Sequence, residues 1–240
     1  MIRFSLVIPA YNEALLLPRL LDTVELARGR YHGGADAIQV IVADNASTDD
    51  TASIAGARGC EVVSVEKRVI AASRNGGARA ARGEVVCFID ADCTIHPQTF
   101  NAIDEAMARP EVIGGATGVR PERWSAGLVA TWLVFLPGVL ATGMDAGVVF
   151  CRRSDFEALG GYDESLDYAE DVMFLWSLRR LGRRRGQRLA RLAGVQAVTS
   201  TRKFDRHGDW HYFTLLPRSA LALLRSTRSE AARRYWYDDR

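Results

Sequence analysis

The sequence lacks the short glycine-rich motifs that mark two common classes of nucleotide-binding enzyme. No Gly-x-Gly-x-x-Gly fingerprint and no Gly-Lys-Ser/Thr phosphate loop occurs in its 240 residues. Their absence argues against a nicotinamide-dependent enzyme and against a P-loop nucleotidase. The four cysteines also lack the close paired spacing of a zinc site or a thiol redox motif. We therefore expect reduced thiols in the cytoplasm.

Long apolar runs are scarce as well. The most apolar stretch, residues 128–140, is shorter than the roughly 20 residues that span a bilayer, and Pro137-Gly138 interrupts it. We predict a buried or interfacial segment there and no membrane span. Met1-Ile-Arg-Phe4 leads directly into a strand pattern, so we expect no signal peptide. No linker rich in Pro, Gly or Ser is visible, and we expect one continuous domain over residues 1–240.

Charge is almost balanced overall but unevenly placed. The formal net charge is +2, yet residues 1–178 carry −9 and residues 179–240 carry +11. Such an asymmetry favours an anionic partner for the C-terminal quarter, either phosphates, a membrane surface or nucleic acid. The hydrophobic content of 48% and the charged content of 25% are those of an ordinary globular protein with a sizeable core.

Strand and helix patterns alternate through the first half of the chain. Apolar runs predict strands, and residues repeating at helical spacing follow each of them. The expected strands are residues 4–9, 38–43, 61–65 and 85–89. Pro18 fits the first turn of the first helix, and Ser47-Thr-Asp-Asp50 has the form of a capping box that opens the second. Repeated units of this length predict an α/β fold with a mostly parallel, doubly wound central sheet flanked by helices.

The pattern changes after about residue 110. Strands are expected at residues 113–119 and 147–152, on either side of the apolar stretch. Ser154-Asp-Phe-Glu157 then resembles the cap of a short helix that ends at Gly160-Gly161, and a longer helix is expected over residues 169–180. We expect residues 1–109 to bind nucleotide and residues 110–240, with their basic C-terminal tail, to shape a second substrate site.

The most informative feature is the pair of aspartates that ends the fourth strand, Val85-Val-Cys-Phe-Ile-Asp-Ala-Asp92. In an open α/β sheet, ligands bind at the carboxyl ends of the strands. In an extended segment Asp90 and Asp92 would point to the same side. Two carboxylates there suit a divalent cation that is shared with phosphate oxygens. The alternative is a strand end followed by an Asp-rich turn.

Other polar segments are expected at the same edge. Pro9-Ala-Tyr-Asn-Glu13 follows the first strand, and Asp44 ends the second, where a carboxylate can accept hydrogen bonds from a base or a ribose. The segment Arg74-Asn-Gly-Gly-Ala78 offers a forked cation for a pyrophosphate. Its glycines are better explained by close packing of helix on sheet, and the first segment also has the composition of a turn with a helix cap.

Taken together, these segments resemble the family 2 glycosyltransferases, which have the GT-A fold, a Rossmann-like nucleotide-diphospho-sugar transferase fold. The matching stretches, which cover roughly residues 4 to 180, are Ser5-Leu-Val-Ile-Pro-Ala-Tyr-Asn-Glu13, Val42-Ala-Asp-Asn-Ala-Ser-Thr-Asp-Asp-Thr51, Arg74-Asn-Gly-Gly-Ala-Arg-Ala-Ala81, Gly83-Glu-Val-Val-Cys-Phe-Ile-Asp-Ala-Asp92, Gly160-Gly-Tyr-Asp-Glu164 and Ala169-Glu-Asp-Val-Met-Phe174. Each is weak alone, but six in the family's order are specific.

The resemblance implies transfer of one sugar from a nucleotide diphosphate donor to an acceptor hydroxyl, with inversion and with Mn²⁺ or Mg²⁺. By the same similarity the donor site comprises Pro9, Tyr11, Glu13, Asp44, Arg74 and Asp90, and Asp92 ligates the metal. The family assigns the general base to the aspartate of Glu170-Asp171, hence Asp171, although both acids also complement a helix dipole.

The resemblance thins in the C-terminal quarter, where related enzymes fold a flexible loop over the donor. Arg202 and Lys203 are expected to contact the pyrophosphate, with solvated surface as the alternative. His207 or His211 is expected to complete the metal site, because imidazole is a common ligand. The Gln-x-x-Arg-Trp signature of processive synthases is absent, so single-sugar transfer is favoured.

The sequence is compatible with more than one role for its C-terminal region, with several acceptors and with two other functions. Basic and aromatic residues around positions 210–237 suit either peripheral contact with the inner face of a membrane or packing on the core or a second subunit. A lipid-linked, protein or small-molecule acceptor is equally compatible. A non-catalytic nucleotide-sugar-binding module and a sugar nucleotidyltransferase are the alternative functions, and no nucleic-acid-binding module is recognised.

Overall fold

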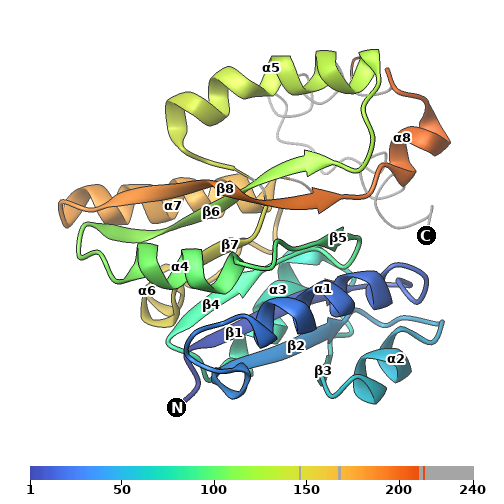
Figure 1. Ribbon diagram of the computed structural model, residues 1–240, viewed down its shortest axis with the longest axis horizontal. Helices are drawn as coiled ribbons and strands as arrows, with labels where there is room; N and C mark the ends of the chain where they lie inside the picture. Colours follow the sequence, from blue (N-terminus) through green and yellow to red (C-terminus); the bar gives the residue numbers. More distant parts are fainter. Residues whose placement is uncertain (146, 167–168, 211–212, 214–240) are drawn as a thin grey trace.

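The computed structural model describes residues 1–145, 147–166, 169–210 and 213. Within these residues the backbone forms one eight-stranded sheet with the order β3-β2-β1-β4-β7-β6-β8-β5, and helices lie on both of its faces (Figure 1). The strands are β1 (Phe4–Ala10), β2 (Ile38–Asp44), β3 (Glu61–Ser64), β4 (Val85–Phe88), β5 (Cys93–Thr94), β6 (Val112–Pro121), β7 (Val149–Arg152) and β8 (Arg188–Thr199). The helices are α1 (Leu17–Gly29), η1 (Ala35–Ala37), α2 (Thr51–Ala57), α3 (Ile70–Arg79), α4 (Thr99–Met107), α5 (Ala126–Thr142), α6 (Arg153–Leu159), α7 (Glu170–Arg184) and α8 (Arg202–His207).

The burial of strand β1 explains why its residues form a continuous, mostly apolar run. All seven of its residues are buried, because each face of the sheet is covered. Phe4, Leu6 and Ile8 pack into a core with α1 and α4, whereas Val7 packs into a second core with α3, α6 and α7. The alternation of side chains along a strand divides one run between two cores.

The first half of the fold is as predicted. Strands β1, β2, β3 and β4 are mutually parallel, and a helix follows each of the first three. Pro18 lies in the first turn of α1. A Cβ at Gly77 would lie 2.5 Å from the side chain of Val7, so this glycine of α3 permits close packing on the sheet, as expected.

The second half departs from a uniformly parallel sheet. Strand β7 is antiparallel to both of its neighbours, β4 and β6, whereas β6 and β8 pair in parallel. Short strand β5 pairs antiparallel with β8. Alternation of strands and helices along the chain does not determine the direction in which a strand enters the sheet, because that depends on the long connection through α5.

Two predicted helix caps are wrong. Helix α2 begins at Thr51, and the side chain of Asp50, its N-cap residue, makes no capping hydrogen bond. The Ser47 hydroxyl instead accepts a hydrogen bond from the Asn12 N–H at 3.0 Å, in the neighbouring loop. Helix α6 begins one residue before Ser154, although it does end at Gly160. The capping motif is short, and for Ser47 a tertiary contact competes with the cap.

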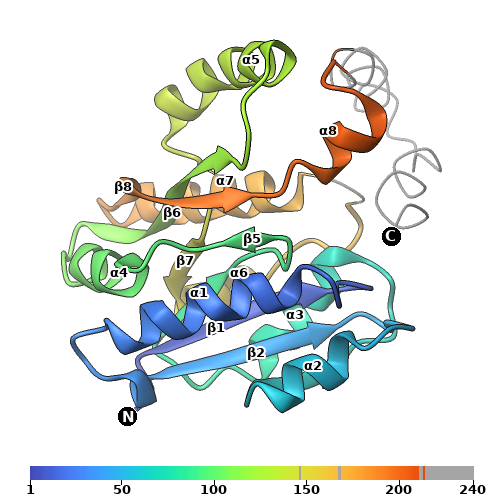
Figure 2. The same cartoon turned by 45° about the vertical axis from the view of Figure 1, so that its right-hand side comes forward.

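The apolar stretch at residues 128–140 is mostly exposed, so the buried alternative is wrong, and Pro137-Gly138 does not interrupt it. Helix α5 continues through Pro137 to Thr142, and its buried residues are Gly127, Leu128 and Thr131. Figures 1 and 2 both show α5 set apart from the sheet and its covering helices. No helix in the described part of the chain is both long and apolar enough to cross a membrane.

Candidate functional site

The loops that follow β1 and β2 are joined by reciprocal hydrogen bonds. Besides the contact of the Asn12 N–H with Ser47, the Thr48 N–H donates to Asn12 Oδ1 at 2.8 Å. The Glu13 N–H donates to Thr51 Oγ1 at 2.8 Å. These bonds hold two segments that lie about forty residues apart as one polar surface at the carboxyl edge of the parallel strands.

Among the residues that the structure describes, three non-glycine residues adopt left-handed backbone conformations, and all three lie in segments that carry candidate site residues. They are Asn12, Ala46 and Ala169, with φ angles of 50°, 61° and 57°. Such conformations cost free energy for residues with a Cβ and persist only where the surrounding structure enforces them. Ala169 is the N-cap of α7 and directly precedes Glu170-Asp171.

The two aspartates after β4 lie on a turn, which corrects the expected extended segment. Strand β4 ends at Phe88, and the Cys93 N–H donates to the carbonyl of Asp90 at 3.1 Å. The turn arises because the chain leaves β4 and enters β5. Each carboxylate then meets a different arginine, Arg74 for Asp90 and Arg202 for Asp92.

Arg74 is buried in α3 and bridges two acids from distant segments. Its guanidinium donates to Asp90 Oδ1 at 2.8 Å and to Glu170 Oε1 at 2.5 Å, and it lies 5.2 Å from the centre of the Tyr162 ring. Burial raises the pKa of Glu170, against the lowering effect of Arg74. Each contact uses one of the two terminal nitrogens of Arg74. The forked guanidinium that was expected to bind a pyrophosphate is therefore already paired with two protein carboxylates.

Asn75, the residue after Arg74, holds the Gly160-Gly-Tyr-Asp-Glu164 segment in place. Its side-chain amide donates to the Tyr162 carbonyl at 2.9 Å and accepts from the Tyr162 N–H at 2.8 Å. A second bond from the amide reaches Glu164 at 3.0 Å. A Cβ at Gly161, whose φ is +80°, would lie 2.5 Å from the Asn75 oxygen. Two of the matched motifs therefore fit directly against each other.

Arg202 makes the second bridge, from the N-terminus of α8. Its guanidinium forms a bidentate ion pair with Glu13, whose side chain is 1% exposed, and it lies 3.3 Å from Asp92 Oδ2. These contacts bring residues 13, 92 and 202 together at the ends of β1, β4 and β8. The sequence predicted each of them for the donor or metal site, but not that they form ion pairs with one another.

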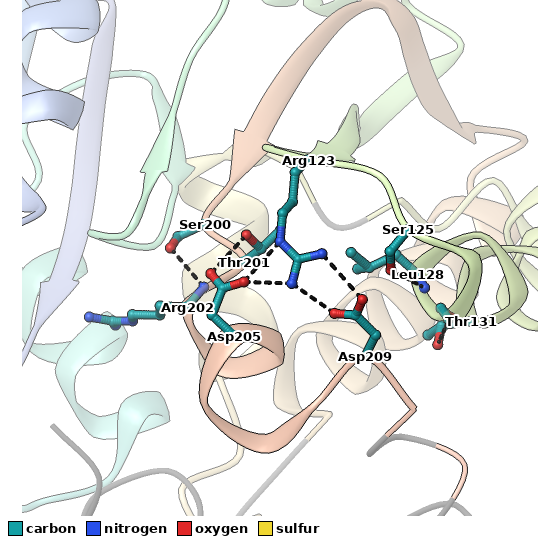
Figure 3. A network of polar contacts seen from close by, with 10 residues as sticks. Arg123, Ser125, Leu128, Thr131, Ser200, Thr201, Arg202, Asp205 and Asp209 are labelled. Carbon is teal, nitrogen blue, oxygen red and sulfur yellow. Dashed lines mark hydrogen bonds and ion pairs between the residues drawn. The ribbon is translucent and has the colours of Figure 1, made fainter.

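Helix α8 is fastened to the start of α5 by Arg123, as Figure 3 shows. The Arg123 guanidinium donates to Asp205 Oδ1 from two nitrogens, at 2.8 and 2.5 Å, and to Asp209 Oδ1 at 2.7 Å. Hydrogen bonds with both acids raise the pKa of Arg123 further above its already high value. No motif in the sequence singled out Arg123.

The remaining donor-site candidates of the first half lie at the same edge. Pro9 is buried in β1 and pairs in register with Ala43. Asp44 ends β2, is 8% exposed, and accepts a hydrogen bond from the Ser47 N–H at 3.3 Å. The ring of Tyr11 is half-buried and carries the Arg68 guanidinium 5.1 Å from its centre.

The candidates of the second half lie at helix ends. Asp171 is half-buried in the first turn of α7, where its charge helps to raise the pKa of Arg74. Lys203 is half-buried in the first turn of α8, and His207 is exposed at the end of that helix. His211 lies outside the described residues. Within the described part of the chain, no group of three or more His, Cys, Asp or Glu side chains is placed to hold a metal.

The charges at this edge favour a cation. Four carboxylates, those of Glu13, Asp90, Asp92 and Glu170, share two guanidinium groups, and Asp171 adds a fifth negative charge nearby. An anionic diphosphate placed against these carboxylates would be repelled by them. Mn²⁺ and Mg²⁺ are bound by one or two carboxylates together with substrate phosphates, so they need no complete protein cage. The oxygen donors present fit such an ion.

Sequence reasoning missed three residues that build the site. Asn12 and Asn75 join loops and motifs, and Arg123 fastens α8. Both asparagines stand inside stretches that already matched the family, beside Glu13 and Arg74, so their position was a usable signal. Nothing comparable marked Arg123, because its partners follow about eighty residues later in the chain.

Comparison with known proteins identifies the family. The model of glycosyl transferase family 2 matches residues 5–150. Validoxylamine A glucosyltransferase of Streptomyces hygroscopicus subsp. jinggangensis is 32% identical over 134 residues, which cover 49% of this chain and 29% of that protein. Undecaprenyl-phosphate 4-deoxy-4-formamido-L-arabinose transferase of Pseudomonas paraeruginosa is 31% identical over 175 residues, 65% of this chain and 48% of that protein. The chain thus spans less than half of either relative.

Solved structures agree on the fold. The mannosyltransferase PcManGT from Pyrobaculum calidifontis, solved in complex with GDP-Man and Mn²⁺, superimposes with a TM-score of 0.63 at 23% identity, over 82% of this chain and 56% of that one. The expected GT-A fold is therefore confirmed. Because the family model covers more than half of its length, the chain belongs to glycosyltransferase family 2.

Proposed function

We propose that this protein transfers a single sugar from a nucleotide diphosphate donor to an acceptor hydroxyl, with inversion at the anomeric carbon. One observation carries the proposal. The paired acids after β4 lie between two arginine bridges that tie them to the first loop, to α7 and to α8. Every segment matched to the family that bears a charged candidate residue therefore contributes to one edge of the sheet.

The donor binds along that edge in this proposal. Pro9, Tyr11 and Asp44 surround the base and ribose, with Glu13 between them and α8. Asp90 accepts a hydrogen bond from a ribose hydroxyl, and the hydrogen bond from Arg74 fixes the orientation of the Asp90 carboxylate. Arg202 and Lys203, side by side in the first turn of α8, contact the diphosphate. Residues 1–109 form the donor half and residues 110–240 the acceptor half.

A divalent ion, Mn²⁺ or Mg²⁺, completes the donor site at Asp92, with His207 as a further ligand. When bound, it supplies Lewis-acid stabilisation of the negative charge that develops on the departing nucleoside diphosphate. The mannosyltransferase structure that contains GDP-Man and Mn²⁺ supports the use of a divalent ion at the donor. Asp92 would hold the ion, and Arg202, which also pairs with Glu13, would lie beside the diphosphate.

Asp171 is the general base. It stands in the first turn of α7, next to Glu170, which Arg74 connects to the donor-side Asp90. This connection sets the distance between the base and the donor through a buried ion pair, so small displacements of either are resisted. Asp171 removes the proton of the acceptor hydroxyl as that oxygen attacks the anomeric carbon. The similarity to an undecaprenyl-phosphate 4-deoxy-4-formamido-L-arabinose transferase supports a lipid-linked acceptor.

The decisive experiment measures release of nucleoside diphosphate from a panel of uridine and guanosine diphosphate sugars, with manganese or with a chelator. We expect release of nucleoside diphosphate in the presence of manganese but not in the presence of the chelator. When an acceptor is added, NMR should show a product of inverted anomeric configuration. Asp171→Asn should lower transfer by about 10²- to 10⁴-fold, the usual size of a general-base contribution, while donor binding persists.

Asp36→Asn, an exposed aspartate in η1, is the matched control and should transfer at the normal rate. Binding of a donor without any turnover would favour the non-catalytic module. Formation of a nucleotide sugar from a sugar phosphate would favour the nucleotidyltransferase. Near-normal turnover by Asp171→Asn would remove that residue from the mechanism.

A further inference from the structure

Helix α5 presents an apolar surface that the rest of the described chain leaves open. None of its 17 residues is charged. Trp132, Leu133, Val134 and Phe135 are 41%, 55%, 51% and 47% exposed, and Leu140 is 62% exposed. Isolated apolar residues on a surface are ordinary, but a contiguous apolar element of this size marks an interaction site.

The distribution of these residues around the helix decides what covers them. Successive residues of an α-helix are rotated by about 100°, so the four exposed positions from Trp132 to Phe135 extend about 300° around the axis. From residue 132 to residue 142 no side chain is buried. A partner helix or a second copy of the chain would cover one stripe. A helix that is apolar all round is normally buried by protein or by lipid, and the described part of the chain does not bury these turns of α5.

The attachment of α5 to the body of the protein is confined to its first turns. Ser125 caps the helix by accepting the Leu128 N–H at 3.3 Å, and the Thr131 hydroxyl donates to the Gly127 carbonyl at 2.9 Å (Figure 3). A Cβ at Gly127 would lie 2.5 Å from the carbonyl oxygen of Asp209, so this glycine lets α5 approach the segment after α8. The remaining turns project beyond this anchor (Figure 2).

An aromatic pair stands where the anchored and projecting parts meet. The rings of Trp124 and Trp132 pack edge to face with their centres 6.2 Å apart, and both are largely exposed. Tryptophan is enriched at the boundary between lipid headgroups and acyl chains, because its ring is apolar and its N–H is polar. The helix is about 25 Å long, and most of this length projects beyond the anchor and can lie in that boundary.

We propose that α5 inserts into the interfacial region of a lipid bilayer and holds the protein on the membrane surface. The contact is apolar, because α5 carries no charge, and so it differs from electrostatic attachment by the basic C-terminal quarter, one of the alternatives that the sequence left open. The proposal does not depend on the proposed function. If both hold, α5 places the site at the membrane, since Arg123 and Asp209 join its base to α8 and Arg202.

Co-sedimentation of the full chain with vesicles tests the proposal. Vesicles of phosphatidylcholine alone and of phosphatidylcholine mixed with phosphatidylglycerol are compared at low and high salt. We expect binding to both types that persists at high salt, because burial of apolar surface is not screened by ions. Leu133→Glu should weaken binding by about tenfold or more, since a side chain of this size gains that much on leaving water.

Leu26→Glu, at an exposed leucine of α1, is the matched control and should bind like the unchanged protein. Both variants should keep the normal melting temperature, because both sites are exposed. No sedimentation of the unchanged protein, or equal binding by Leu133→Glu, would overturn the proposal. Binding that needs anionic lipid and disappears at high salt would assign the contact to the basic C-terminal quarter instead. A dimer in light scattering that Leu133→Glu dissociates, without vesicle binding, would assign α5 to a second copy.

Discussion

At the scale of single residues, the site is organised by two arginines that each join two acids. Arg74 connects Asp90 to the buried Glu170, and Arg202 connects Asp92 to the buried Glu13. Removing one partner of a buried ion pair leaves an uncompensated charge, which is costly, whereas the complete pair fixes geometry. Neighbouring aspartates that look equivalent in the sequence are therefore held by independent parts of the fold.

The titration of Glu170 gives a prediction at this scale. Burial raises its pKa in the folded protein above the ordinary value of 4.5. The unfolded chain therefore releases this proton first as pH rises. The contribution of Glu170 to stability is complete below pH 4.5 and is lost as pH rises through the raised pKa. We expect the free energy of unfolding of Glu170→Gln to decline less with pH across this window than that of the unchanged protein.

Urea denaturation at a series of pH values measures this difference. Glu157→Gln, at an exposed glutamate of α6 that pairs with Arg153, is the control and should leave the pH dependence unchanged. Identical pH profiles for Glu170→Gln and the unchanged protein would show that burial does not raise the pKa of the Glu170 carboxyl. The prediction is independent of which donor the protein uses.

At the scale of elements, α8 is the part whose position depends most on side chains rather than on the sheet. It has six residues, none of them buried, and its contacts include the ion pairs of Arg202 at its start and of Arg123 with Asp205 and Asp209. A short helix without a buried face is only marginally stable by itself. Charge-assisted hydrogen bonds of Arg202 and Arg123 therefore help to hold α8 in its orientation over the site.

Arg123→Ala tests that dependence. Loss of the contacts with Asp205 and Asp209 should leave α8 less ordered before the donor binds, so that binding must order it. We expect the KM for the donor to rise by about threefold to tenfold, with a smaller change in kcat and in melting temperature. Steady-state kinetics with the best donor measure this.

Arg153→Ala, which breaks a comparable surface ion pair with Glu157 far from α8, is the control and should leave KM unchanged. An unaltered KM in Arg123→Ala would mean that α8 keeps its position without this arginine. A fall in kcat alone would instead place α8 in the chemical step.

At the scale of the whole molecule, one sheet joins the two halves. Strand β7 pairs with β4 of the first half and with β6 of the second, so the edge proposed to bind the donor and the helix that carries Asp171 belong to one continuous structure. Ligand binding at that edge is therefore linked to the unfolding of the entire domain, because ligand that binds only the folded state stabilises it by mass action.

A thermal-shift measurement uses this linkage to test the metal. With the correct donor and manganese at about 100 times their dissociation constants, stabilisation of about 2.7 kcal/mol should raise the melting temperature by about 5 °C or more. A chelator should remove most of the shift, because the acids at the site repel the diphosphate without a cation. Asp92→Asn should behave like the chelated protein, and Asp36→Asn like the unchanged one.

An equal shift with and without the chelator would contradict the assignment of a divalent ion to Asp92. A full shift in Asp92→Asn would move the ion to other ligands. The donor sugar and base that give the largest shift identify the substrate, which the variable region between residues 120 and 145 leaves undetermined in the sequence.

The sequence alone determined the family and the alternation of β1 to β4 with their helices, because local periodicity and six ordered motifs depend only on residues close together in the chain. It also placed Glu13, Asp44, Asp90 and Asp171 at or near the ends of strands or helices. Tertiary structure decided what local patterns do not encode. It set the reversed direction of β7, the turn at Asp90 and the exposure of α5.

The partners of Arg74, Arg202 and Arg123 were likewise decided by the tertiary structure. Each of these arginines meets at least one acid that is about eighty or more residues away, and such pairs follow from how the sheet brings its strand ends together. A short motif states which side chains are present but not which charge each will face. That depends on the three-dimensional path of the chain between them.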